Sequence, residues 1–195
     1  MTYDSTSREG WRVVFAGALL LTAVTGLGAA EKRMVLLNVE QGELPQDTGG
    51  GVSASLSEEH TATKDGISLK MAFAEKGGGW VGQYGVKRKD WTGFTKLSFR
   101  LFTALERKTV MSFVVKDKGS TSRKEWAVLH FEVKPGDGDY RVDLADLKAQ
   151  SGRKLDIASV EQWHFSYRFF PEAEWEEKGA EAATFYLGTV RLLSE

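Results

Sequence analysis

The chain has 195 residues, a formal net charge of −1 and no cysteine. Without cysteine, neither a disulfide framework nor a lipidated N-terminal cysteine can form. Domains that bind nucleic acid are usually strongly basic, so the near-neutral charge excludes nucleic acid from the expected partners.

The first thirty residues have the pattern of an export signal. Arg8 and Arg12 make the start basic, an apolar run covers 13–27, and Gly28-Ala29-Ala30 supplies small residues before a cleavage point. We expect residues 1–30 to be a signal peptide and the mature protein to be periplasmic or extracellular. The alternative is an uncleaved anchor, but a run of about 15 residues is shorter than the ~20 that a membrane-spanning helix needs. No stable membrane insertion is therefore expected after cleavage.

Residues 31–195 are expected to form one all-β domain. Apolar residues recur mostly at every second position, in short runs separated by glycine and charged turns, which is typical of strands. We expect about ten strands, at 34–39, 51–56, 67–73, 79–86, 97–102, 111–116, 126–133, 140–144, 163–169 and 183–193. So many short strands predict two packed antiparallel sheets, a β-sandwich.

Glycine-rich segments at 48–51, 77–79 and 134–138 are expected to be turns. They do not suit phosphate binding, because strand patterns rather than helices follow them. The segment from Pro171 to Gly179 breaks the strand rhythm with a proline start, acids in its first turn and a glycine stop. It predicts one short helix or an acidic loop.

Several short motifs follow one another in a recognisable order along 34–193. They are Gly79-Trp80, 90–99, 114–117, 131–136, 140–144, 155–157 and 185–192. Their order and spacing resemble the galactose-binding-like jelly roll of many carbohydrate-binding modules and of the complex I intermediate-associated protein family. The resemblance implies a mostly non-catalytic domain that binds sugar on a concave sheet face or at loop tips.

The same resemblance bears on metal binding. Many such modules hold a structural calcium between a glutamate near the first strand and an aspartate in the last one. Glu40 matches the glutamate, but Gly188 stands where the aspartate would be. Calcium prefers six or more oxygen ligands, so no metal and no other cofactor is expected.

Strand alternation also predicts a polar and aromatic face. Because the residues of 127–133 that alternate with His130 are apolar, Trp126 and His130 should point away from the core. The same argument turns arginines and a histidine outward from two other strands. Sugar sites combine flat aromatic surfaces with planar hydrogen-bonding groups. The expected ligand-binding residues are Arg100, Trp126, His130, His164 and Arg168. The alternative is that this is only the solvated side of a sheet.

Trp80 and Tyr84 are two further candidates for ligand binding. They lie in a glycine-flanked run whose inward and outward phase the sequence leaves open. They could form a ligand platform, or they could cover the open end of the sandwich together with Trp91.

No catalytic residue is expected. The chain has three histidines, no cysteine and no serine in a nucleophile-elbow context. A glycosidase needs two carboxylates across a cleft, which spacing alone cannot show. The sequence thus favours an exported, non-catalytic domain that binds carbohydrate or a related polar ligand. The alternative is a protein-interaction or assembly factor of the cell envelope that uses the same surface.

Overall fold

The computed structural model describes residues 31–63, 66–74, 78–168 and 182–194. The predicted signal peptide at 1–30 and the predicted helix or acidic loop at 171–179 lie outside these residues. The described strands are β1 (Arg33–Leu37), β2 (Asp47–Gly49), β3 (Ser53–Ser57), β4 (Ser68–Phe73), β5 (Gly79–Tyr84), β6 (Lys96–Thr103), β7 (Thr109–Asp117), β8 (Ala127–Val133), β9 (Gly136–Asp143), β10 (Lys148–Ala149), β11 (Val160–Tyr167), β12 (Ala183–Leu187) and β13 (Val190–Leu193). Three single-turn 3₁₀ helices accompany them: η1 (Val39–Gln41), η2 (Arg123–Glu125) and η3 (Leu144–Asp146).

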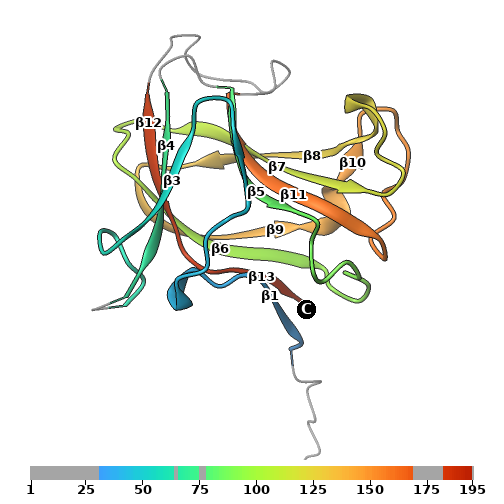
Figure 1. Cartoon of the computed structure of the whole chain (residues 1–195), viewed down its shortest axis with the longest axis horizontal. Helices are drawn as coiled ribbons and strands as arrows, with labels where there is room; N and C mark the ends of the chain where they lie inside the picture. Colours follow the sequence, from blue (N-terminus) through green and yellow to red (C-terminus); the bar gives the residue numbers. More distant parts are fainter. Residues whose placement is uncertain (1–30, 64–65, 75–77, 169–181, 195) are drawn as a thin grey trace, which may run out of the picture. The chain divides into compact units, whose positions relative to one another are not determined.

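The strands form two antiparallel sheets, which Figure 1 shows as separate layers. Sheet A has the order β1-β13-β6-β12-β4-β3, and β9 pairs with β6 as well. Sheet B has the order β10-β8-β7-β11-β5-β2. Strands from the two ends of the domain are neighbours, as β1 and β13 are in sheet A. The domain is an antiparallel β-sandwich with a jelly-roll fold.

Alternation along each strand supplies the core between the sheets. In β6, Leu97, Phe99 and Leu101 are buried while the residues between them are half-buried. The Phe99 ring lies 4.9 Å from that of Phe165, which comes from β11 of sheet B. Aromatic contacts of this kind join the two sheets, because each ring buries a large apolar area at an edge-to-face geometry.

The all-β prediction is confirmed, and each of the ten expected runs contains a strand. The described residues hold thirteen strands because the run at 183–193 is split at Gly188-Thr189, and because β2 and β10 have only three and two residues. Strands that short show no alternation in the sequence. The turn expected at 134–138 is wrong in part, since β9 begins at Gly136, which pairs with Thr103.

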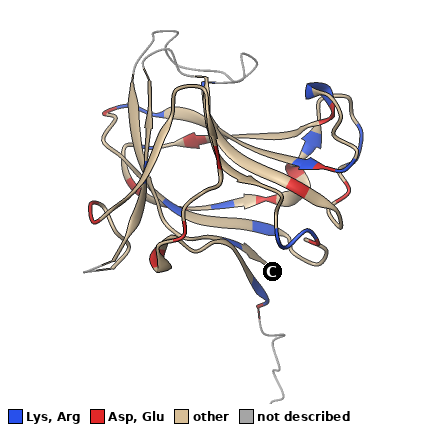
Figure 2. Cartoon of the chain, viewed as in Figure 1, with Lys and Arg blue, Asp and Glu red and all other residues tan. Residues whose placement is uncertain are grey.

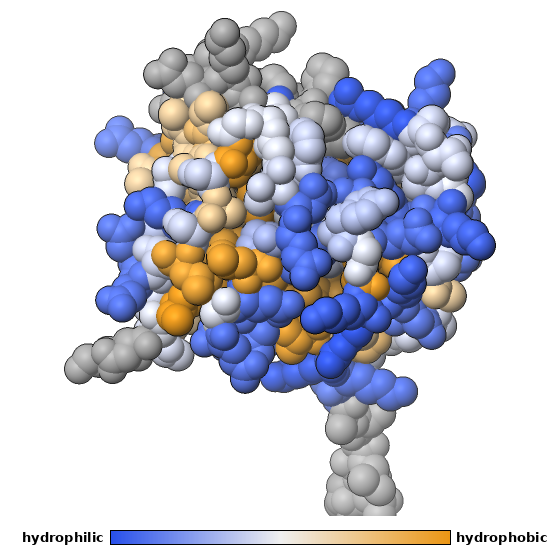
Figure 3. All heavy atoms as spheres, viewed as in Figure 1, coloured by the Kyte–Doolittle hydropathy of each residue, from blue (hydrophilic) through white to orange (hydrophobic). Residues whose placement is uncertain are grey.

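Charged residues are unevenly distributed over the fold. In Figure 2 most of them lie in the connections and at strand ends, whereas long stretches of the central strands carry none. On the face drawn in Figure 3, apolar surface gathers on the side where β3 and η1 lie, and hydrophilic side chains cover much of the rest.

Candidate functional site

The register of four neighbouring strands brings polar and aromatic side chains together on the outward face of sheet B. Gln162 of β11 lies opposite Tyr84 of β5 and Lys116 of β7. Two residues along, His164 lies opposite Gly82 and Val114, and Ser166 lies opposite Trp80 and Ser112. Ser112 in turn lies opposite His130 of β8. Side chains two apart on a strand share a face, so these cross-strand rows form one continuous surface.

A cavity of about 180 Å³ opens on this surface. Its lining residues are Asp47, Trp80, Tyr84, Lys116, Trp126, Gln162 and His164. Four of them, Trp80, Tyr84, Trp126 and His164, were candidates from the sequence. The cavity is small beside the ~300–1,000 Å³ typical of pockets for drug-sized ligands, so it suits one ring-sized group.

Two indole rings flank His164 at the floor of the cavity. The ring centres of Trp80 and His164 are 6.4 Å apart, and those of Trp126 and His164 are 6.3 Å apart. The Trp80 ring extends over Gly49 of β2, where a Cβ atom would lie 2.3 Å from the indole. Trp80 Nε1 donates a hydrogen bond of 3.1 Å to Asp47 Oδ1. Gly49 and Asp47 thus fix the orientation of this indole.

His164 is 3% exposed. Burial, with a smaller contribution from the nearby Lys116 ammonium group, lowers its pKa to about 3. The imidazole is therefore neutral at neutral pH, and a neutral imidazole carries one hydrogen-bond donor and one acceptor. The Nδ1 atom is enclosed and has no hydrogen-bond partner among the described residues, which leaves Nε2 as the nitrogen that a sugar hydroxyl could reach.

Asp47 and Lys116 place two opposite charges at the cavity. Asp47 Oδ2 accepts a hydrogen bond from Gln162 Nε2, so the carboxylate binds one side chain with each of its oxygens. Lys116 Nζ lies 3.6 Å from the centre of the Trp126 ring. Partial burial lowers the pKa of Lys116, while the charge of Asp47 opposes this effect. The ammonium group orients Trp126 through a cation–π interaction.

His130 belongs to the same face but not to the cavity. Its Nδ1 atom is 2.7 Å from Ser112 Oγ, which lies next to Ser166 in the register. The Ser166 hydroxyl is buried and has no hydrogen-bond partner in the part of the chain that the structure describes. His130 and these serines extend the polar surface beyond the two indoles.

The expectation that Arg100 shares this face is wrong. Arg100 lies on β6, which pairs with β9, β12 and β13 in sheet A. Its guanidinium group binds the carboxylate of Asp137 and donates to the carbonyl oxygen of Thr61 at 2.6 Å. Alternation predicted correctly that the side chain points outward, but outward from the other sheet.

Arg168 also lies outside the cavity lining. It follows the last residue of β11 and has a φ of 52°. A residue in this left-handed conformation no longer follows strand alternation. The alternation that predicted an outward Arg168 on the binding face therefore does not apply at this position. Trp91 is fully buried in the core, where its Nε1 donates to the carbonyl oxygen of Arg88 at 3.0 Å. Trp80 and Tyr84 line the cavity on sheet B instead, so the three side chains do not form one shared cover.

Sequence reasoning did not select Asp47, Lys116 and Gln162. Lys116 and Gln162 have the outward phase of their strands, and this signal was visible in the alternation. Asp47 carried no such signal, because β2 has three residues and its pairing with β5 is a long-range contact.

Glu40 and Gly188 hold the two positions that provide calcium ligands in many modules of this fold. Glu40 forms an ion pair, and Gly188 has no side chain to bind a metal. Glu40 Oε2 lies 3.4 Å from Arg191 Nη2, and the Glu40 backbone N–H donates to Thr189 Oγ1 at 3.4 Å. A guanidinium group thus neutralises this carboxylate. Within the described ranges, no group of three or more histidine, aspartate or glutamate side chains is arranged to hold a metal ion.

No protein-family model and no curated protein matches the sequence. Solved structures are similar in fold. The family 11 carbohydrate-binding module of the cellulosomal cellulase Lic26A-Cel5E of Clostridium thermocellum aligns with a TM-score of 0.59 and 16% identity, over 84% of this chain and 95% of the module. A family 11 module from Clostridium thermocellum in complex with a β-1,3-1,4-mixed-linked tetrasaccharide aligns with a TM-score of 0.58 and 17% identity, over 83% of this chain and 94% of the module.

An exo-β-agarase aligns with a TM-score of 0.61 and 14% identity over 83% of this chain but 25% of the agarase. The chain therefore has the β-sandwich jelly-roll fold of carbohydrate-binding modules. A domain of this fold is also part of larger agarase chains.

Across the described residues, no helix has the length and apolar character needed to cross a membrane.

Proposed function

We propose that this protein is an exported, non-catalytic domain that binds carbohydrate through the outward face of sheet B. The observation that carries the proposal is the position of the Trp80 and Trp126 rings, 6.4 and 6.3 Å from a buried, neutral His164. Indole faces complement the apolar C–H face of a sugar ring, and planar polar groups bind its hydroxyls.

The polar groups of the cavity are held in place before any ligand arrives. Asp47 binds Trp80 and Gln162, and Lys116 lies against Trp126. A rigid sheet that presents oriented side chains loses little conformational entropy on binding. This is the arrangement expected of a recognition site for a small polar ring.

The lining of the cavity supports binding rather than hydrolysis. Asp47 is the single carboxylate among its seven lining residues. Most glycosidases place two carboxylates about 5–9.5 Å apart across the scissile bond. A second acid within the cavity would be needed for that chemistry, and Glu132 of β8 is instead paired with Lys108 at 3.1 Å.

The similar structures suggest the first ligands to try. The family 11 module was solved with a β-1,3-1,4-mixed-linked tetrasaccharide, and agarases contain a domain of the same fold. Mixed-linked β-glucan and agarose are therefore suitable probes.

Export rests on the basic and apolar pattern of residues 1–30, and N-terminal sequencing of the secreted protein would show whether cleavage occurs before Glu31.

Affinity electrophoresis through gels that contain each polysaccharide tests the binding proposal. The protein should be retarded by at least one of them. Trp126→Ala should weaken the affinity at least about tenfold, as loss of an aromatic contact worth about 1.4 kcal/mol would do. Arg100→Ala is the matched control, because Arg100 lies on sheet A and should leave retardation unchanged.

Two outcomes would contradict the proposal. The first is the absence of retardation by any polysaccharide. The second is a stable protein partner, isolated from the cell envelope, that an excess of sugar does not displace; this would favour the assembly-factor alternative.

A further inference from the structure

A second cavity, of about 350 Å³, has a lining drawn from both sheets. Its lining comes from β1, the segment around η1 that leads to β2, the end of β5 and the connection from β5 to β6. In sheet A, β1 is an edge strand, and β2 pairs with β5 only as far as Gly82. This second cavity therefore lies where both sheets have an open edge. It shares no residue with the seven that line the first cavity, on sheet B.

Side-chain amides dominate the polar part of this lining. They belong to Asn38, Gln41, Gln46 and Gln83. Gln83 is 8% exposed, and its amide makes no hydrogen bond to any described residue. The amide is nevertheless not completely enclosed by protein. Since buried polar groups are nearly always paired, this amide faces the cavity with its hydrogen-bonding capacity unused.

A run of cations stands at the same cavity. Lys87 and Arg88 line it, and Lys89 follows directly. Figure 2 shows this run as a continuous basic stretch after β5. None of the three side chains forms an ion pair with a carboxylate of the described ranges. The carboxylate in the lining, Glu43, accepts a hydrogen bond of 2.7 Å from the backbone N–H of Asn38.

From these contacts we infer that the cavity binds an acidic sugar unit, one that carries a carboxylate or a sulfate group. The amides would bind the hydroxyls, since each amide both donates and accepts, and the cations would bind the anionic group. An unpaired guanidinium group suits planar, two-point recognition of such an anion. The second cavity is separate from the cavity on sheet B, so the inference stands whether or not the sheet B cavity binds a neutral sugar.

Nuclear magnetic resonance titration of ¹⁵N-labelled protein tests the inference with three probes. D-galacturonate supplies a carboxylate, D-galactose 6-sulfate supplies a sulfate, and D-galactose supplies neither. At least one of the two acidic sugars should shift the Gln83 side-chain amide signals and the backbone signals of 85–88. D-galactose should bind about tenfold more weakly at these positions, because it lacks the charge-assisted contacts. The stronger of the two acidic probes identifies the anionic group.

The double variant Lys87→Gln, Arg88→Gln should reduce the affinity for the acidic sugar to that for D-galactose. Both side chains are exposed, so the fold should be unaffected. Trp126→Ala, in the sheet B cavity, should leave these shifts unchanged. A loss of binding in the sheet B cavity therefore does not imply a loss of binding in the second cavity. Equal shifts with neutral and acidic sugars would overturn the inference. So would the absence of shifts at 83–88, or their loss in Trp126→Ala.

Discussion

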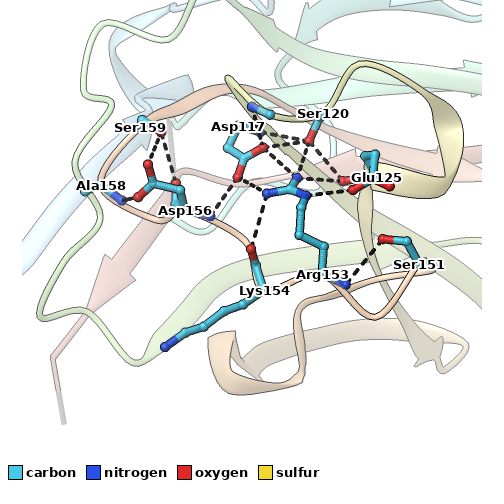
Figure 4. A network of polar contacts seen from close by, with 10 residues as sticks. Asp117, Ser120, Glu125, Ser151, Arg153, Lys154, Asp156, Ala158 and Ser159 are labelled. Carbon is cyan, nitrogen blue, oxygen red and sulfur yellow. Dashed lines mark hydrogen bonds and ion pairs between the residues drawn. The ribbon is translucent and has the colours of Figure 1, made fainter.

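The guanidinium group of Arg153 binds both carboxylate oxygens of Asp117. Arg153 Nη1 lies 2.7 Å from Asp117 Oδ2, and Nη2 lies 2.8 Å from Oδ1. The Asp117 side chain is fully buried, whereas that of Arg153 is 31% exposed. Arg153 Nε also binds Glu125 at 2.7 Å, and Asp117 accepts the backbone N–H of Asp156 (Figure 4). This network joins the end of β7 to the connections before β8 and β11.

Replacing Asp117 with asparagine should destabilise the domain strongly. The substitution keeps the shape of the side chain but leaves the guanidinium group without its buried counter-charge. Arg153 is 31% exposed and keeps Glu125 as a partner, so the loss should be about 2–3 kcal/mol, below the about 3–5 kcal/mol typical of a fully buried pair. Urea denaturation should show a lower midpoint with an unchanged slope. Asp137→Asn is the control, because its partner Arg100 and Asp137 itself are 29% and 41% exposed and surface pairs contribute about 0–1 kcal/mol. Equal losses in both variants would contradict the prediction.

The same network should make stability depend on acid. Burial raises the pKa of Asp117, but the hydrogen bonds from Arg153, Asp156 and Ser120 outweigh it and lower the pKa to about 2. A depressed carboxyl pKa stabilises the folded state above the unfolded pKa and loses this contribution as pH falls through the folded one. The loss should fall between about pH 4 and pH 2. Unfolding free energies measured across this window should fall less steeply in Asp117→Asn than in the unaltered protein.

Strand alternation predicted the outward direction of four candidate side chains, Arg100, Trp126, His130 and His164, but not the sheet to which each belongs. Trp126, His130 and His164 share a face because β8 and β11 both pair with β7. Arg100 has the same phase, but β6 is in sheet A. Phase is a local property of an extended chain, whereas sheet membership depends on pairings between distant segments. For the same reason Asp47 reaches the cavity without any local signal in the sequence.

His164 gives a second pH dependence, in a different range. Its folded pKa of about 3 lies below the ordinary 6.5 of histidine, chiefly because of burial. Between these values the unfolded chain takes up a proton that the folded one does not, so stability falls as pH falls from about 6.5 towards 3. His164→Asn should therefore reduce the difference between unfolding free energies measured at pH 7 and pH 4.5. The imidazole signals of His164 should also stay unshifted from pH 5 to pH 8, and a titration in that interval would disprove the assignment.

Lys116 should affect sugar binding through Trp126. With Nζ 3.6 Å from the ring centre, the ammonium group restrains the indole. Such contacts are worth about 0.5–2 kcal/mol. Lys116→Met keeps the apolar stem and removes the charge, and it should weaken retardation by the bound polysaccharide about threefold to tenfold. Lys118→Met is the matched control, because Lys118 is exposed beyond the end of β7 and does not line the cavity. Equal effects would show that only net charge matters.

Gly82 is where the fold and the candidate site depend on the same atom. A Cβ atom at this position would lie 2.1 Å from the Trp163 carbonyl oxygen and 2.4 Å from His164 Cα. Gly82→Ala must therefore push β5 away from β11, and these two strands carry Trp80 and His164. Overpacking of this kind costs about 1–3 kcal/mol, and sugar binding should be lost as the indole moves away from the imidazole.

Gly85→Ala separates this effect from the general cost of replacing a glycine. Gly85 has a φ of 65°, and a Cβ atom there would meet nothing within 4 Å. Its substitution carries only the backbone cost of a left-handed residue, about 1–2 kcal/mol, and should leave polysaccharide retardation unchanged. Thermal unfolding and affinity electrophoresis of both variants decide the matter. If Gly82→Ala retained full binding, close pairing of β5 with β11 would not be what positions the site.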